Sequence, residues 1–508
     1  MKQAATIMIQ GTASDVGKSV LSTALCRIFV QDGWKTAPYK SQNMALNSYV
    51  TLDGKEIGRA QGVQAEACGI AATTDMNPIL IKPTGDMKAQ IVVHGKPLEE
   101  MSAWRYREEY IPLAGGIVTD ALNRLRGEYD IVVLEGAGSP AEINLKDRDI
   151  VNMRMAKWAD APVLLVADID RGGVFASIVG TLELLEEDER NRVKGFIINK
   201  FRGDVSLLQP GLDWLEERTG IPVLGVIPHM PRLDIEAEDS VVLEKRKDQA
   251  GNEDKEIDIA VIRLPRISNF TDFDPLEAEP DVSLRYVESV DQLGQPDIIM
   301  IPGSKNTLED LLFLEQSRIA EAIAKLVAEG SYLAGICGGY QMLGRNLYDP
   351  QQVESAHVEA NGLDYLPLAT TFFTEKRTER VSGSVASTHP DWPAMQGLPI
   401  EGYEIHMGQT IPLAQAHSLL SINGQAEGTI SEDGRIFGTY VHGIFHNDAF
   451  RRQYLNMVRI HNHLAPIEEI LPFRSRQIEA FDRLAEHVRA HLDMEQIYSI
   501  LGISKVQL

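Results

Sequence analysis

Runs of hydrophobic residues alternate with amphipathic stretches through the first 235 residues of the chain. The runs are continuous and rich in Val, Ile and Leu, which is typical of parallel strands that are buried on both faces. The stretches between them repeat their apolar residues with a helical period. This alternation predicts a doubly wound sheet, with strands expected at residues 5–9, 35–40, 130–138, 161–168, 193–200 and 223–228.

A strongly charged stretch interrupts this pattern after residue 235. It is rich in Glu, Asp, Lys and Gln, which indicates a solvated connector. The hydrophobic runs then resume, and the first of them is Ile259–Leu264. The sequence therefore predicts an α/β fold of two doubly wound domains, residues 1–235 and 258–460, with a charged linker at 236–257 and a C-terminal helical extension at 461–508.

The glycine-rich segment Gly11–Ser19 is the first candidate site. It follows the first strand and precedes a helical pattern, and this context is that of a phosphate-binding loop. Backbone N–H groups of such a loop surround phosphate oxygens, while its lysine reaches the β- and γ-phosphates and its serine binds Mg²⁺. Five residues separate Gly11 from Gly17, one more than in the common motif, which points to a sub-branch of P-loop enzymes. We expect ATP and Mg²⁺ to be held by Gly11, Thr12, Asp15, Gly17, Lys18 and Ser19.

A second candidate site is centred on Cys337, in the run Gly335–Gly339. A short apolar strand leads in and a helical pattern leads out, which predicts a nucleophile elbow built around a thiol. A helix N-terminus favours the thiolate, the reactive form of cysteine. The alternative interpretation is a buried structural cysteine, since free cysteines are among the most buried residues.

His442 is the expected general base for this thiol, because it stands at the end of its own predicted strand. His406 is a second possibility. The turn at Gly303 and the amide of Gly338 are candidates for an oxyanion hole, which often provides the largest single contribution to the rate.

The composition of the chain argues against two classes of binding partner, nucleic acids and membranes. The formal net charge of −24 argues against nucleic acid, whose phosphates require a basic face. No apolar run reaches the length of a membrane span, and the N-terminus shows no signal peptide. The three cysteines Cys26, Cys68 and Cys337 have no metal-binding spacing, and Cys26 and Cys68 fall in helical patterns as expected core residues. We expect a cytoplasmic enzyme with neither membrane nor nucleic-acid partners.

Specific motifs resemble those of the cobyric acid synthase family, and together they cover nearly the whole chain. In the second half the resemblance is to class I-like glutamine amidotransferase domains, and in the first half to dethiobiotin-synthetase-like P-loop ligases. The motifs that carry it include Lys40–Ser48, Glu135–Pro140, Asp168–Phe175, Asn269–Asp274, Pro302–Thr307, Gly335–Gln341 and Tyr440–Gly443.

This resemblance implies a reaction. Members of the family amidate the b, d, e and g carboxylates of adenosylcobyrinic acid a,c-diamide to give adenosylcobyric acid, in cobalamin biosynthesis. The implied substrates are this corrinoid, L-glutamine and ATP, with the corrinoid carboxylate activated as an acyl phosphate and ammonia released by a Cys337–His442 pair. Lys40 matches a second phosphate-site lysine and Glu135 an acidic residue that holds Mg²⁺, while Arg59 and Arg171 are candidates to meet substrate carboxylates.

One position departs from ordinary class I amidotransferases. Those enzymes have a glutamate two residues after the catalytic histidine, where this chain has Ile444. The sequence therefore leaves open which group orients His442, and Glu404 is one candidate.

Two alternatives stay open. Cobyrinic acid a,c-diamide synthase shares both domains, although the Lys40–Ser48 motif favours cobyric acid synthase. The second alternative is a non-catalytic P-loop switch protein with a vestigial second domain. The presence of both Cys337 and His442 argues against this alternative.

Overall fold

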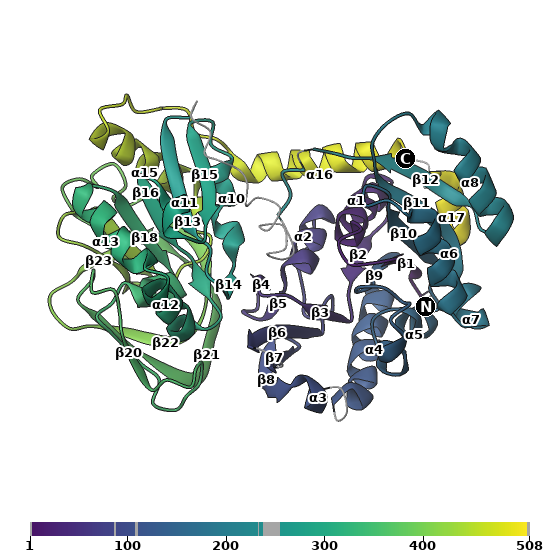
Figure 1. The fold of residues 1–508 in the computed structure, drawn as a ribbon, viewed down its shortest axis with the longest axis horizontal. Helices are drawn as coiled ribbons and strands as arrows, with labels where there is room; N and C mark the ends of the chain where they lie inside the picture. The colour runs from purple at the N-terminus through teal and green to yellow at the C-terminus, as the bar shows by residue number, and fades with distance from the viewer. Residues whose placement is uncertain (1–2, 86–87, 107–109, 232, 237–254, 505–508) are drawn as a thin grey trace. The chain divides into compact units, whose positions relative to one another are not determined.

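The computed structural model describes residues 3–85, 88–106, 110–231, 233–236 and 255–504. The chain forms two compact units (Figure 1). Unit 1 comprises Met1–Ala45, Glu56–Glu238 and Ser475–Leu508, and unit 2 comprises Leu46–Lys55 and Asp239–Arg474. Most of the predicted linker, residues 237–254, lies outside the described residues.

The main sheet of unit 1 has six strands that all run parallel, in the order β12-β11-β10-β1-β9-β2. The continuous hydrophobic runs form these strands as predicted, because both faces of the sheet are covered by helices. Their bounds are β1 Ala5–Gly11, β2 Thr36–Tyr39, β9 Ile131–Glu135, β10 Val163–Asp168, β11 Val193–Phe201 and β12 Val223–Pro228.

One face of this sheet is covered by α1 (Lys18–Gln31) together with the C-terminal helices α16 (Phe473–Arg489) and α17 (Met494–Leu501). Alternate strand residues such as Ile7 and Ile9 enter the same buried cluster as Leu484 and Val488 of α16. Cys26 and Cys68 lie in this core, as expected. The C-terminal segment from Ser475 onward therefore belongs to unit 1, although more than 200 residues of unit 2 separate it in sequence from the rest of that unit.

The remaining elements of unit 1 include a small mixed sheet in the order β3-β6-β7-β8. Its strands are β3 Gln42–Met44, β6 Ile79–Gly85, β7 Lys88–Val93 and β8 Lys96–Ser102, and β5 is Glu56–Gly58. The helices are α2 Arg59–Ala67, α3 Ala103–Arg105, α4 Ile111–Glu128, α5 Met153–Ala159, α6 Val174–Leu184, α7 Glu187–Arg190 and α8 Val205–Thr219, with a 3-10 turn η2 at Ile143–Arg148.

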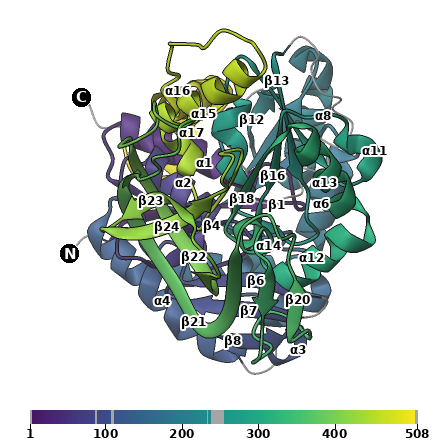
Figure 2. The same cartoon turned by 90° about the vertical axis from the view of Figure 1, so that its left-hand side faces the viewer.

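Unit 2 contains a second doubly wound sheet whose parallel part has the order β15-β13-β16-β18-β25. The sheet continues into a mostly antiparallel extension, whose long strands are labelled in Figure 2. The parallel strands are β13 Ile257–Ile262, β15 Val282–Val287, β16 Ile298–Ile301, β18 Tyr332–Ile336 and β25 Ile436–Thr439. The extension consists of β19 Asn346–Tyr348, β20 Glu359–Asn361, β21 Leu368–Val385, β22 Pro399–Pro412, β23 His417–Ile422 and β24 Gln425–Ile430.

The helices of unit 2 are α10 Asp274–Glu277, α11 Val290–Leu293, α12 Thr307–Gln316, α13 Ile319–Glu329, α14 Gly338–Met342 and α15 Asp448–His461. A short antiparallel pair is formed by β14 Ile267–Ser268 and β17 Gly303–Ser304, and the 3-10 turns η3 Phe270–Phe273 and η4 Ile444–His446 contact each other. Unit 2 also includes β4, Ser48–Val50, from the segment 46–55.

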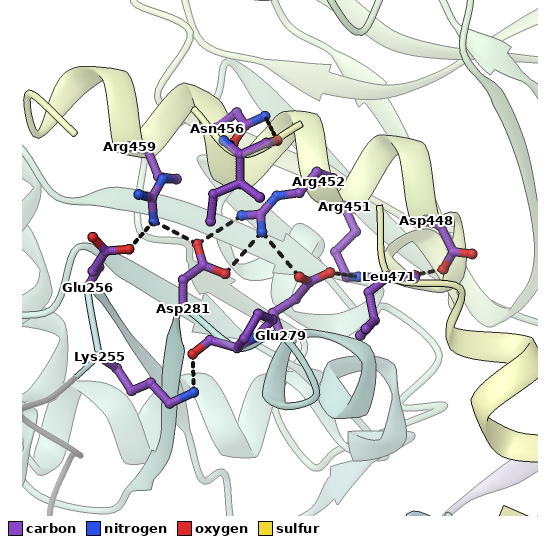
Figure 3. A network of polar contacts seen from close by, with 12 residues as sticks. Lys255, Glu256, Glu279, Asp281, Asp448, Arg451, Arg452, Asn456, Arg459 and Leu471 are labelled. Carbon is purple, nitrogen blue, oxygen red and sulfur yellow. Dashed lines mark hydrogen bonds and ion pairs between the residues drawn. The ribbon is translucent and has the colours of Figure 1, made fainter. Parts of the chain in front are cut away.

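A buried ionic network ties α15 to the start of β13 and β15 (Figure 3). Arg452 donates to both carboxylate oxygens of Asp281, at 3.0 Å each, and to Glu279 at 3.2 Å. Burial alone would raise the pKa of Asp281, but hydrogen bonds and positive charge from Arg452 and Arg459 hold it below its usual value. The two arginines therefore stabilise the charged form of Asp281 inside the unit.

Across the described residues, no helix is both long enough and apolar enough to cross a membrane.

Candidate active sites

Cys337 stands at the junction of β18 and α14, in a strained backbone conformation with φ 52° and ψ −105°. Positive φ is uncommon for a residue with a side chain and is found where the surrounding structure enforces it. The flanking glycines allow this turn: a Cβ on Gly339 would lie 2.0 Å from the Ile301 carbonyl oxygen, and one on Gly335 2.7 Å from the Gly339 backbone. The predicted nucleophile elbow is therefore present in the backbone.

His442 is hydrogen-bonded to the Cys337 side chain and is fully buried. Its Nδ1 is 2.7 Å from Asp272 Oδ2, and the other oxygen of Asp272 accepts the N–H of Gly443 at 2.9 Å. Since a carboxylate accepts and does not donate, Nδ1 carries a proton and Nε2 is the nitrogen available for chemistry. Asp272, and not Glu404, thus occupies the position of the group that orients His442.

The charges around His442 favour its protonated form. Burial alone would lower the pKa of His442, but the negative charges of Asp272 and of a Cys337 thiolate raise it to about 10. The ring also stacks on Tyr403, with centroids 5.0 Å apart. The arrangement can take the thiol proton and hold the resulting imidazolium against a buried carboxylate.

The two predicted oxyanion glycines lie at the same place. A Cβ on Gly303 would be 3.2 Å from His442 Cε1, and a Cβ on Gly338 would be 2.8 Å from the Ser304 nitrogen. Gly303 therefore lies beside His442, and Gly338 packs against the residue that follows Gly303, so that a side chain at either glycine would be crowded. Their role in binding an oxyanion stays a prediction.

His406 and Glu404 form a separate cluster on β22. His406 Nε2 lies 3.1 Å from Glu404 Oε2, and Arg377 Nε lies 3.0 Å from the same oxygen. The His406 ring stacks on Tyr440 at 3.7 Å. Neither residue contacts His442 through these bonds, so the structure assigns the orienting contact to Asp272.

In unit 1 the glycine loop joins β1 to α1 as predicted, and Gly17 adopts φ 99° at the start of the helix. A Cβ on Gly17 would lie 2.2 Å from Asn199 Nδ2, and one on Gly11 would lie 2.5 Å from Val16 Cγ2. The N–H of Thr12 donates to the Val166 carbonyl at 2.9 Å. Lys18 Nζ donates to the carbonyls of Ala13 and Gly138, at 2.8 and 3.0 Å, so that its ammonium lies over the loop.

Glu135, at the end of β9, brings the other predicted residues together. One of its oxygens accepts both the Ser19 hydroxyl at 2.8 Å and Lys40 Nζ at 2.9 Å, and the other accepts Gln64 Nε2 at 2.6 Å. Glu135 is only 1% exposed. A hydroxyl beside a buried carboxylate is a donor set that suits the hard cation Mg²⁺, and thus the residues fit the expected metal.

Asp15 and the predicted substrate arginines have partners within unit 1. Arg171 Nη2 lies 2.9 Å from Asp15 Oδ2, and Arg59 Nε lies 2.5 Å from Glu236 Oε2. Lys200 donates to the Asp15 carbonyl and to Asp168 Oδ2. These bonds place Arg171 and Lys200 beside Asp15 of the glycine loop.

Sequence reasoning missed several of these groups. Asp272 and Asn269 belong to a motif that carried the family resemblance but suggested no chemistry. Gln64, which contacts Glu135, likewise belongs to such a motif without a role having been assigned to it. Asn199 and Lys200 contact the glycine loop, and nothing in their local pattern distinguishes them from other polar residues at the ends of strands. Contacts across the sheet, and not spacing, bring them to the site.

Comparison with known proteins agrees with both halves of this description. Residues 7–242 match the family model described as the CobQ/CobB/MinD/ParA nucleotide binding domain. Residues 258–450 match that of the CobB/CobQ-like glutamine amidotransferase domain.

Relatives that match this chain over nearly its full length support the same family assignment. The chain is 55% identical over 498 residues to the cobyric acid synthase of Geobacillus sp. (strain WCH70), covering 98% of each chain. It is 54% identical to that of Geobacillus thermodenitrificans, with 99% of each chain covered, and 54% identical to that of Dehalococcoides mccartyi strain CBDB1, with 98% of each covered. The predicted resemblance is confirmed, and the chain belongs to the cobyric acid synthase family of enzymes, with a nucleotide-binding domain fused to a glutamine amidotransferase domain.

Proposed function

We propose that this chain uses ATP and glutamine to amidate the b, d, e and g carboxylates of adenosylcobyrinic acid a,c-diamide, giving adenosylcobyric acid. The observation that carries the proposal is the similarity, over practically the full length, to proteins named cobyric acid synthase. We place the reaction in the cytoplasm, and we expect glutamine and a corrinoid as the partners.

Unit 2 supplies ammonia in this proposal. Cys337 gives its proton to His442 and attacks the side-chain amide carbon of glutamine, and the developing oxyanion is held at Gly303 and Gly338. The amide nitrogen leaves as ammonia with the proton from His442, and a γ-glutamyl thioester remains. Water, deprotonated by His442, then releases glutamate. The 2.7 Å contact with Asp272 supports the role of His442, because it fixes the ring and stabilises its protonated form.

Unit 1 activates the carboxylate. The glycine loop and Lys18 bind the phosphates of ATP, and Lys40 offsets negative charge at the transferred phosphoryl group. Ser19 and Glu135 would hold Mg²⁺, which supplies charge neutralisation on the phosphate oxygens when bound. A free carboxylate is a poor electrophile, so phosphorylation provides the leaving group that ammonia displaces to form a primary amide.

The test is mass spectrometry of the corrinoid after incubation with ATP, Mg²⁺ and glutamine. The proposal predicts four successive amidations of cobyrinic acid a,c-diamide. Amidation of unamidated cobyrinic acid, with no reaction of the a,c-diamide, would assign the chain to the alternative a,c-diamide synthase. Absence of amidation on both substrates, with ATP hydrolysis that ignores glutamine and corrinoid, would favour the P-loop switch protein.

A further inference from the structure

A buried carboxylate, that of Asp310, is bonded to the turn that contains Gly303. Asp310 lies on α12, and its side chain is fully buried. Its Oδ2 accepts the hydroxyl of Ser304 at 2.6 Å and the backbone N–H of Arg266 at 3.2 Å. No step of the proposed reaction uses this group, although burying a carboxylate costs free energy that apolar packing would avoid.

The charge of Asp310 determines the direction of its bond to Ser304. Burial raises the pKa of Asp310 to about 6, although its contacts with Ser304 and Arg266 act to lower it. At neutral pH and above the group is therefore mainly a carboxylate, which only accepts hydrogen bonds. The Ser304 hydroxyl must donate to it, and the hydroxyl oxygen in turn accepts the N–H of Asn306 at 3.0 Å.

These bonds join three segments of backbone at one carboxylate. Arg266 immediately precedes β14, Ser304 ends β17, and Asn306 is the N-cap of α12. The strands β14 and β17 pair in antiparallel fashion, and the N–H of Lys305 donates to the Arg266 carbonyl at 3.0 Å beside them. Asp310 thereby fixes both strands of this pair to the helix that carries it.

The strand pair held in this way includes backbone at the reacting groups. Gly303 precedes Ser304 in β17, and a Cβ on Gly303 would be 3.2 Å from His442 Cε1. A Cβ on Gly338, at the start of α14, would be 2.8 Å from the Ser304 nitrogen. A shift of Ser304 therefore moves backbone that lies against both the nucleophile elbow and the proposed base. A misplacement of about 1 Å in an active site can lower the rate roughly a hundredfold.

We propose that Asp310 is a positioning residue for glutamine hydrolysis, which through Ser304 holds the Gly303 turn where the oxyanion of the tetrahedral intermediate forms. In this role Asp310 touches neither glutamine nor Cys337. It lowers the energy of the transition state by keeping the backbone donors in place before the reaction begins. The inference rests on the proposed function, because this oxyanion arises only when Cys337 attacks the glutamine amide.

Two variants and a control separate positioning from general stability. Asp310→Asn keeps the shape of the side chain but replaces one acceptor oxygen by a donor, and Ser304→Ala removes the hydroxyl while leaving the carboxylate. If Asp310→Asn proves poorly folded by circular dichroism, Ser304→Ala carries the test alone. Glu315→Gln is the control, because it removes the charge of an exposed carboxylate on the same helix.

The first readout is the release of glutamate from glutamine at pH 7.5, with ATP, Mg²⁺ and cobyrinic acid a,c-diamide present. Asp310→Asn and Ser304→Ala should each lower kcat/KM for glutamine by about 10- to 100-fold, since the lost interaction acts in the transition state. The double variant should be no worse than the poorer single variant, because both changes break the same bond. Glu315→Gln should match wild type.

The second readout is the alkylation of Cys337 by iodoacetamide, followed by peptide mass spectrometry. Displacement of iodide by a thiolate forms no oxyanion, so this rate reports the thiolate and not the oxyanion donors. We expect both variants to be alkylated at the wild-type rate. Parallel losses of hydrolysis and alkylation would indicate a distorted elbow and overturn the proposal, as would unchanged hydrolysis. Glutamate release by wild type without amidation of the corrinoid would count against the proposed function alone.

Discussion

Asp272 Oδ2 lies 2.7 Å from His442 Nδ1, although 170 residues separate the two in the chain. Both side chains are buried, so the contact is shielded from water and salt. It provides the orienting carboxylate that the sequence lacks at position 444. The same carboxylate also accepts the N–H of Gly443, which fixes its own position.

Replacing the carboxylate of Asp272 should impair glutamine hydrolysis but should not affect the amidation of the corrinoid by free ammonia. We expect Asp272→Asn to lower kcat for glutaminase by about 10²- to 10⁴-fold, because an amide no longer fixes the Nδ1–H tautomer or stabilises the imidazolium. Corrinoid amidation driven by free ammonia should stay at the wild-type rate. Steady-state assays with glutamine and with ammonium chloride check both, and an equal loss in the two would indicate a structural defect instead.

The stabilising effect of Asp272 should depend on pH. The folded-state pKa of His442 is raised above its unfolded value, to about 10. Its contribution to the free energy of unfolding is therefore complete below about pH 6.5 and is lost as pH rises towards 10. Urea titrations of wild type and Asp272→Asn should show the largest difference near pH 6 and the smallest near pH 10. A difference that grows with pH would contradict this assignment.

The sequence predicts those parts of the two sites whose contacts join residues that are close in the chain. Gly11–Ser19 and Gly335–Gly339 are local patterns of strand, turn and helix, and both fold as expected, since neighbouring residues determine their geometry. Glu135 was matched through a motif, and its place beside Ser19 follows from pairing of the adjacent strands β1 and β9.

Asp272 and Asn269 lie in a turn without a periodic pattern. They contact His442 across sequence separations of 170 and 173 residues, which are long-range contacts that spacing does not reveal. Glu404, the candidate from the sequence, lies on β22 and is bonded to His406 and Arg377 instead. The C-terminal helices α16 and α17 were predicted as an extension, but their place in the core of unit 1 depends on the complementary face of the sheet.

Glu135 should control the metal requirement. Glu135→Gln keeps the shape but removes the charge that we expect to hold Mg²⁺, so the apparent affinity for Mg²⁺ in ammonia-driven amidation should fall by about 10- to 100-fold. The glutaminase activity of the same variant should be unchanged. Glu186→Gln is the control, because the Glu186 side chain is 74% exposed and its ion pair is with Lys146. An unchanged Mg²⁺ requirement would remove Glu135 from the site.

The ionic network of Figure 3 should be essential to the stability of unit 2. Arg452→Met leaves the carboxylates of Asp281 and Glu279, both buried, with one partner fewer, which should cost about 3–5 kcal/mol of unfolding free energy. Arg345→Met removes an exposed partner of Asp364 and should cost less than about 1 kcal/mol. Thermal unfolding monitored through loss of glutaminase activity compares the two, and similar midpoints would contradict the prediction.

The most direct test of the account follows nitrogen from glutamine to the corrinoid. With amide-¹⁵N glutamine, ATP and Mg²⁺, mass spectrometry should find four ¹⁵N atoms in the product of wild type. Cys337→Ala should transfer none from glutamine, yet should form the same product from ¹⁵N-ammonium. Transfer of glutamine nitrogen by Cys337→Ala would contradict the assignment of Cys337 as the nucleophile, and with it the division of the reaction between the two units.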